Sequence, residues 1–461
     1  MLRLAPLFVR RRLAGSATHS AELKQGAVVA FALQMGGVAM GFLQQLGLTH
    51  WMTDTAAYGR YVTLMSLALL LASVASLGLP QAVLRFVAAH RGRGDGEGAR
   101  KVARLAGAMS GMCGLALGLA TALGACLIFT VFIPDAARMR EVLAVAVWVP
   151  LLGLGLVYAA ACRGEQRMFL SLFFDRIGRQ ALLLSAVYLF MRMSGKPDSG
   201  QTLWLFTGIL AASTAIHVWM YHARPATAGL AGHGGVHHHA QHTPVGRRVL
   251  LRVGLPLLLS NGFAVAMGQT DTFLVGTLSG DRDAGVYSVA SRISLLAAVS
   301  LVIVNSVAAP AVAAMHAKGE RVRVARAVAS FAHWSFWPSL ACIVLIVCFD
   351  RQILGLFGPD FIGAKWPMVI LLAGQLFNTG CGSVGLLLNM TGHQDDVAKV
   401  FAFGAALNIG LNLVLIPPMG IAGAAIATSA SMVAWNVWLC ILVRKRLGID
   451  ASIFGAFRKQ V

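Results

Sequence analysis

An isolated aspartate lies in the middle of a long apolar stretch of the sequence. Asp271 falls within GQTDTFLVG, residues 268–276, and no lysine or arginine lies within ten residues of it on either side. A carboxylate is costly in such surroundings, so it usually binds a proton or an ion, or pairs with a cation. Asp271 is therefore a candidate for uptake of H⁺ or Na⁺, or for a salt bridge with Arg292. The alternative is a purely structural hydrogen bond to a hydroxyl.

Four arginines lie within or at the edge of apolar stretches and could bind an anionic group such as a phosphate. They are Arg85, Arg176, Arg179 and Arg292. In FFDRIGR, Asp175 and Arg179 are four residues apart, which predicts an ion pair along one helix and leaves Arg176 free for a ligand. The alternative for each arginine is a position at a membrane interface, where its long side chain reaches the lipid headgroups.

Three uncharged polar residues, Gln45, Asn408 and Asn412, also lie in apolar stretches. They could line a polar cavity, although hydrogen bonds between helices are the simpler explanation. We find no Ser/His/Asp arrangement and no paired carboxylates suited to covalent catalysis, so we expect neither an enzyme nor an organic cofactor. Six histidines in segment 222–249 could bind a divalent metal, but the segment has neither acidic residues nor the ligand spacing of a zinc site. A flexible glycine-rich linker is the favoured interpretation, so we expect no metal there.

The composition indicates a chain that crosses a membrane many times. Of 461 residues, 57% are hydrophobic and 12% are charged, which is about half the charged fraction of a soluble protein. The apolar residues form blocks of about twenty, long enough to cross a ~30 Å hydrocarbon core as helices. We expect an all-α integral membrane protein with twelve spans, at residues 26–48, 59–84, 105–133, 142–161, 169–190, 203–221, 250–279, 286–313, 328–348, 366–390, 397–416 and 420–442.

The charges between these spans predict the topology. When each charge is assigned to its nearer side, the side that holds both termini carries 29 Lys and Arg against 9 Asp and Glu, and the other side carries 8 of each. The whole net charge of +20 therefore lies on one face. By the positive-inside rule both termini are cytoplasmic, and the basic face is expected to attract anionic membrane lipids rather than nucleic acid.

An internal repeat relates the two halves of the chain. AAYGRY at 56–61 matches RDAGVY at 282–287, and CRGEQ at 162–166 matches MTGHQ at 390–394. The register overlays Gln45 on Asp271, and it predicts two six-helix bundles in parallel orientation. We therefore divide the chain into a cytoplasmic basic N-terminus, an N-terminal bundle, a cytoplasmic linker, a C-terminal bundle and a cytoplasmic basic tail, at residues 1–25, 26–221, 222–249, 250–442 and 443–461.

Several stretches resemble the polysaccharide-biosynthesis flippases, or Wzx-type O-antigen transporters, of the MOP superfamily that also holds the MATE exporters. The resemblance covers nearly the whole chain and is most specific in TDTFLVGTLSGDRDAGVYSVASRIS (270–294) and LNIGLNLVLIPPMGIAGAAIATSAS (407–431). It implies a V-shaped transporter that flips an undecaprenyl-pyrophosphate-linked oligosaccharide to the outer leaflet of a bacterial inner membrane, for O-antigen, exopolysaccharide or capsule assembly. It also implies alternating access, a monomer, and partners among the polysaccharide polymerase and chain-length machinery.

Two other functions remain open from the sequence. A MATE-like, cation-coupled exporter of small molecules would use the same fold, but its cavity should be acidic where that of a pyrophosphate flippase should be cationic. A membrane glycosyltransferase or polymerase is disfavoured because the predicted outer loops are all short.

Overall fold

The computed structural model describes residues 32–132, 134–165, 168–223 and 246–456. Within these ranges the chain forms helices and turns with no β-strand, which confirms the all-α prediction. Segment 1–25, and segment 222–249 apart from its two ends, lie outside the described residues. The predictions made for them, including that for the histidine-rich stretch, stay predictions.

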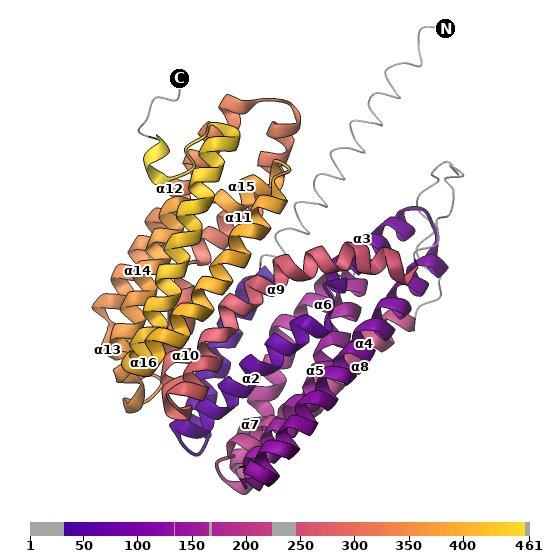
Figure 1. Ribbon diagram of the computed structural model, residues 1–461, viewed down its shortest axis with the longest axis vertical. Helices are drawn as coiled ribbons and strands as arrows, with labels where there is room; N and C mark the ends of the chain where they lie inside the picture. The colour runs from indigo at the N-terminus through magenta and orange to yellow at the C-terminus, as the bar shows by residue number, and fades with distance from the viewer. Residues whose placement is uncertain (1–31, 133, 166–167, 224–245, 457–461) are drawn as a thin grey trace.

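The first half of the chain forms a bundle that we call the N-terminal lobe (Figure 1). Two short π-helices, Ile128–Phe132 and Phe174–Gly178, follow α4 and precede α7. The helices of this lobe are one over 32–51, α2 (Thr55–Ala75), α3 (Leu79–Gly92), α4 (Gly96–Leu127), α5 (Ala136–Gly164), α6 (Met168–Phe173), α7 (Arg179–Ser194) and α8 (Ser199–His222).

The second half forms the C-terminal lobe, and the long helix α9 (Arg247–Leu278) lies between the two lobes (Figure 1). Two 3₁₀ helices, η4 (Pro359–Ala364) and η5 (Ile453–Ala456), belong to this half. Its other helices are α10 (Asp281–Leu296), α11 (Val299–Ala317), α12 (Arg321–Cys348), α13 (Asp350–Gly355), α14 (Lys365–Cys381), α15 (Val384–Met390) and α16 (Gln394–Leu447).

Several of the predicted spans are built from more than one helix. Seven helices in the described part of the chain are individually long and apolar enough to cross a membrane, or eight if α14 and α15 form one bent span. The predicted span 59–84 is divided between α2 and α3, where Leu77 and Gly78 adopt positive φ angles of 52° and 66°. The predicted span 286–313 is likewise divided between α10 and α11. The number twelve remains a prediction.

Helix α16 folds back on itself and contains two of the predicted spans. Its only non-helical residue is Gly420, with φ 55° and ψ −134°, two positions after Pro418 in the sequence Pro417-Pro418-Met419-Gly420. Across this reversal, the Nδ2 of Asn408 donates to the Oγ of Ser431 over 3.4 Å. The two arms of α16 therefore lie antiparallel.

Gly420→Ala is expected to destabilise the protein by about 1–3 kcal/mol, because a side chain in this backbone conformation is strained. The measurement is thermal unfolding of the purified protein in detergent. Gly410→Ala is the matched control, since Gly410 lies within the same helix and a Cβ there would meet no atom within 4 Å. Equal unfolding temperatures for the two variants would contradict the assigned turn.

The two lobes meet where α2 crosses α10. A Cβ added to Gly59 would lie 1.6 Å from the backbone oxygen of Asp281, and one added to Gly285 would lie 3.3 Å from the Cα of Gly59. Nearby, Gly276 of α9 packs against Thr63 of α2. Gly59 and Gly285 occupy equivalent positions of the repeat. We call this contact the outer seam, because the charge count predicts that this end of the helices lies on the outer side.

Helix α9 links the lobes along its length (Figure 1). Its first half packs on the N-terminal lobe, where a Cβ on Gly78 would lie 2.1 Å from the backbone oxygen of Gly254. Its second half also reaches the C-terminal lobe, where Met267 lies beside Gly404 of α16. This crossing brings Asp271 to the inside of the molecule.

Candidate functional site

Asp271 lies at the centre of a polar cluster in the C-terminal half. Its side chain is 5% exposed. The Nδ2 of Asn412 donates to Oδ1 over 2.7 Å, the Oη of Tyr287 donates to Oδ2 over 3.2 Å, and the hydroxyl of Thr428 also donates to Oδ2. With Asn408 these residues form what we call the Asp271 cluster, which draws on α9, α10 and both arms of α16.

The two asparagines leave unused acceptors in this cluster. The Nδ2 of Asn412 donates to the backbone oxygen of Asn408 over 2.9 Å as well as to Asp271, which fixes the orientation of its amide group. Both side chains are buried, and the Oδ1 atoms of Asn408 and Asn412 have no hydrogen-bond partner among the described residues. A carboxylate and two amide oxygens are hard oxygen ligands of the kind that bind a small cation.

Thr428→Val should test the contribution of the hydroxyl. Valine has nearly the same shape but cannot donate a hydrogen bond, so the buried carboxylate loses one of its donors at a cost of about 1–3 kcal/mol. The measurement is the change in thermal unfolding temperature in detergent. Thr277→Val is the control, because the exposed Thr277 bonds only to the backbone of its own helix. A loss of the same size in both variants would contradict a special role for Thr428.

Arg292 does not pair with Asp271. Among the described residues Asp271 makes no ion pair, and its hydrogen-bond donors are all neutral. Tyr287 faces Asp271, whereas Arg292 comes five residues later on α10, about 140° further around the helix at 3.6 residues per turn. The predicted salt bridge is therefore absent from this conformation, and Arg292 is exposed.

Gln45 is buried in the helix over 32–51, as expected of a polar residue inside a bundle, and its Oε1 has no hydrogen-bond partner in the part of the chain that the structure describes. The adjacent Gln44 donates through Nε2 to the Oη of Tyr61 over 3.5 Å. Tyr61 and Tyr287 are equivalent in the repeat. Each lobe thus places a tyrosine of its second predicted span against a polar residue of its first, although the contact uses Gln44 rather than Gln45.

The predicted ion pair between Asp175 and Arg179 is wrong. Asp175 instead lies 3.4 Å from the Nη1 of Arg163 on α5 and 3.7 Å from the Nε2 of His217 on α8. Phe174–Gly178 is a π-helix rather than a regular α-helix, and the carboxylate of Asp175 faces these side chains of two neighbouring helices instead of Arg179. His217 is buried here.

The remaining arginines lie apart from the Asp271 cluster. Arg179 stacks over the ring of Phe206 with its Cζ 5.9 Å from the centroid. Arg176 is exposed beside Gly37, where an added Cβ would lie 2.8 Å from the Cβ of Arg176. Arg85 is exposed on α3.

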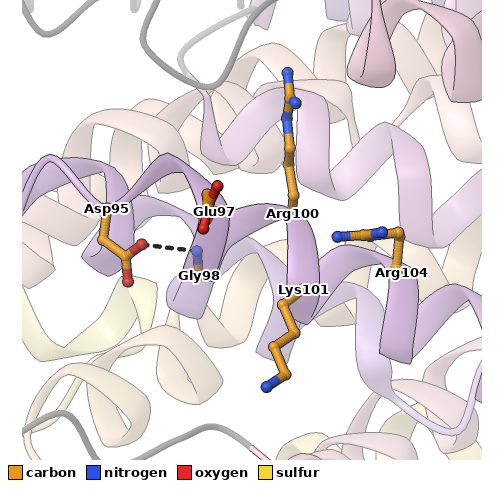
Figure 2. Close-up of a pocket in the computed structure, with 6 residues that line it drawn as sticks. All are labelled: Asp95, Glu97, Gly98, Arg100, Lys101 and Arg104. Carbon is orange, nitrogen blue, oxygen red and sulfur yellow. Dashed lines mark hydrogen bonds between the residues drawn. The ribbon is translucent and has the colours of Figure 1, made fainter.

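A cavity of about 410 Å³ lies elsewhere, at the start of α4. Its charged lining consists of Asp95, Glu97, Arg100, Lys101 and Arg104. Figure 2 shows that the three basic side chains point in different directions, so they do not converge on one ligand position. The cavity belongs to the basic face of the molecule and is separate from the Asp271 cluster. No group of His, Cys, Asp and Glu in the described ranges has the arrangement of a metal site.

Comparison with known families identifies the chain. The sequence model described as "Polysaccharide biosynthesis protein" matches residues 23–316. The chain belongs to this polysaccharide biosynthesis family. A second model, MatE, matches residues 256–414, which include Asp271 and Asn412.

Curated relatives of this family member match over limited regions. It is 25% identical over 166 residues to the probable low-salt glycan biosynthesis flippase Agl15 of Haloferax volcanii, a match that covers 35% of this chain and 34% of the relative. It is 37% identical over 87 residues to an uncharacterized membrane protein of Methanocaldococcus jannaschii, a match that covers 18% of this chain and 17% of the relative. The chain thus spans about a third or less of these relatives.

Solved structures share the fold over nearly the whole chain. A multidrug-resistance MATE transporter of the MOP superfamily in an inward-facing conformation superposes with a TM-score of 0.67, at 16% identity, covering 92% of this chain and 98% of that one. A MOP-superfamily transporter from Pyrococcus furiosus superposes with a TM-score of 0.60 at 17% identity, covering 92% and 96%. The chain therefore shares the fold of these transporters over most of its length, and its apolar helices make it a multi-pass membrane protein.

Proposed function

We propose that this protein flips an undecaprenyl-pyrophosphate-linked oligosaccharide from the cytoplasmic to the outer leaflet of a bacterial inner membrane. The product would serve the assembly of O-antigen, exopolysaccharide or capsule. Family membership supports this substrate class, as does the similarity to a glycan biosynthesis flippase. The two lobes and the seam between them suit alternating access, in which the lobes part on one side at a time.

The distribution of charge is the observation that favours a lipid-linked glycan over a cationic drug as the substrate. Asp271 is 95% buried and accepts three hydrogen bonds, so its carboxylate is not presented to a large substrate. The cationic side chains Arg85, Arg176 and Arg292 are exposed. Arginine is well suited to pyrophosphate because its planar guanidinium can bind two phosphate oxygens at once. This pattern favours an anionic substrate over the MATE-like export of cations.

Two arginines from opposite lobes would share this role. Arg179 of α7 and Arg292 of α10 both lie within electrostatic range of Tyr61 of α2, which supports their meeting the same ligand. Arg176 and Arg85 would then receive the pyrophosphate nearer the cytoplasmic face. Gln45, Asn408 and Asn412 would contribute polar groups to the interior rather than direct phosphate contacts.

Asp271 would couple transport to the uptake of H⁺ or Na⁺. A proton would neutralise the carboxylate, and Na⁺ would be held by the carboxylate together with the unpartnered oxygens of Asn408 and Asn412. Because the cluster joins α9, α10 and α16, its occupancy can bias how these helices pack. No organic cofactor is required for such a cycle.

We also propose how the protein lies in the membrane. Both termini would face the cytoplasm, the basic face would contact anionic lipids, and the protein would act as a monomer. Its protein partners would be the polysaccharide polymerase and the chain-length machinery. No role for nucleic acid is proposed, because the positive charge is explained by topology.

The deciding experiment is translocation by the purified protein in proteoliposomes. A fluorescent undecaprenyl-pyrophosphate oligosaccharide should move between leaflets, whereas a small organic cation such as ethidium should not accumulate. Imposing a Na⁺ gradient and a pH gradient separately then identifies the coupling ion. Transport of ethidium without movement of the lipid-linked oligosaccharide would contradict the flippase proposal and favour a MATE-like exporter.

A further inference from the structure

A short segment of the C-terminal lobe reaches across to the N-terminal lobe at the outer seam. It comprises α13, a turn at Gly358 with φ 123°, and η4. The Oδ2 of Asp350 and the Nζ of Lys365 lie 2.8 Å apart, and this ion pair closes the base of the segment. Lys365 beside Asp350 holds the pKa of that carboxyl below its usual range. We call residues 350–365 the strap.

Two aromatic side chains anchor the strap to the N-terminal lobe. Phe357 and Phe361 are almost completely buried, at 1% and 2% exposure. Phe357 packs edge-on against Phe42 with ring centroids 5.2 Å apart, and Phe361 packs edge-on against Tyr58 at 6.2 Å. Phe42 lies in the helix over 32–51 and Tyr58 in α2, so both anchors cross between lobes.

A polar contact lies beside these anchors. The Oδ2 of Asp360 accepts a hydrogen bond from the Oγ1 of Thr55 in the N-terminal lobe over 2.7 Å, and its Oδ1 accepts one from the Nη2 of Arg282 over 2.9 Å. The hydroxyl of Thr55 and the guanidinium of Arg282 hold the pKa of Asp360 below its usual range. Because these groups are exposed, the contact adds less stabilisation than the buried rings.

The strap covers the same seam that must part if the outer side opens. Tyr58, which receives the Phe361 ring, also accepts a hydrogen bond at its Oη from the Ser288 hydroxyl of α10 over 3.2 Å. Tyr58 is thus held by the strap and by α10 together. Separation of α2 from α10 exposes both rings of the strap to water, because their partners Phe42 and Tyr58 remain with the other lobe.

We propose that the strap is the closing element of the outer gate: Phe357 and Phe361 hold the lobes together on the outer side, and their release sets how often that side opens. This inference rests on the alternating access of the proposed function, but not on the identity of the substrate. The strap belongs to the C-terminal lobe and its binding surface to the N-terminal lobe. It can therefore detach and rebind as the lobes separate and close.

The test uses a cysteine placed beneath the seam. Thr63 is buried against Gly276 where the lobes meet, so a membrane-impermeant maleimide added from outside should label Thr63→Cys only when the seam opens. In this background Phe361→Ala should raise the labelling rate roughly tenfold, the change that about 1.4 kcal/mol of lost contact between lobes produces. Each variant is also measured without Thr63→Cys, which gives the labelling of the native cysteines.

Ile362→Ala is the matched control, because Ile362 lies on the same strap but is 42% exposed. It should label at the parental rate. Equal labelling of the Phe361→Ala and Ile362→Ala variants would overturn the proposal. Maleimide labelling needs no substrate. A result that contradicts the role of the strap is therefore distinguishable from a result that contradicts the flippase proposal.

A second pair of substitutions keeps the proposal testable if Phe361→Ala does not fold. Thr55→Cys combined with Asp360→Cys places two thiols across the contact between lobes. Oxidation should join them, abolish labelling of Thr63→Cys and stop transport, and a reductant should restore both. Unchanged labelling after complete cross-linking would show that the seam opens with the strap in place, which overturns the proposal.

Discussion

Asp271→Asn is expected to reduce translocation of a labelled lipid-linked oligosaccharide to background while the protein still folds. A loss of more than about 100-fold corresponds to about 2.7 kcal/mol. The physical reason is that an amide neither takes up a proton nor balances the charge of Na⁺. The measurement is the initial rate in proteoliposomes, with the thermal unfolding temperature recorded on the same sample.

The fold should tolerate this change because the surrounding donors can adapt. The new amide oxygen can accept from the Nδ2 of Asn412, and the new amide nitrogen can donate to the hydroxyls of Tyr287 and Thr428 once these rotate. No cation loses a partner, since Asp271 makes no ion pair in the described part of the chain. A structural role alone would therefore leave transport nearly intact.

Asp395→Asn provides the matched control, because it is the same chemical change at an exposed position at the start of α16. Transport by this variant should equal that of the wild type. Wild-type rates in Asp271→Asn, with an unchanged unfolding temperature, would exclude Asp271 as the coupling site and leave only its structural hydrogen bonds.

Gly59→Val is expected to prevent the outer seam from closing. Even a Cβ at this position would lie 1.6 Å from the backbone oxygen of Asp281 and 3.0 Å from the backbone nitrogen of Gly285. Because these are backbone atoms, no side-chain rotation relieves the clash, and α2 and α10 must move apart. Overpacking of this kind costs about 1–3 kcal/mol or more, which is enough to change which conformation is populated.

The measurement for Gly59→Val is maleimide labelling of Thr63→Cys from the outside, which should become fast and independent of substrate. Transport should stop, because a cycle needs the seam to close. Gly208→Val is the control, since an added Cβ at Gly208 of α8 meets no atom within 4 Å. Slow labelling in Gly59→Val would show that the close approach of α2 and α10 is not required.

Only some members of the Asp271 cluster could be predicted from the sequence. The carboxylate, Asn408 and Asn412 could be picked out because polar residues in apolar blocks are conspicuous. Thr428 could not, because threonines are ordinary where membrane helices pack and this one lies 157 residues from Asp271 along the chain. Tyr287 was visible only as half of a repeated motif, and nothing in the sequence indicated that its hydroxyl bonds the carboxylate.

Two charged pairs considered from the sequence do not form. The pair of Asp271 with Arg292 was one of several alternatives, and it is absent because Tyr287 faces Asp271 while Arg292 lies about 140° further around α10. The pair of Asp175 with Arg179 was inferred from helical spacing, and it is absent because Asp175 instead faces Arg163 and His217 on neighbouring helices. Spacing along one helix does not show which side chains other helices bring to the same carboxylate.

The sequence by itself determined the helical membrane class, the family and, as predictions, the topology and the two halves, because hydropathy, charge and repeats are properties read along the chain. The tertiary structure alone decided the partners of Asp271, the break at Gly420, the crossing at Gly59 and the strap that carries Phe357 and Phe361. These features depend on which surfaces meet, and residues more than a hundred positions apart meet only once the helices have packed.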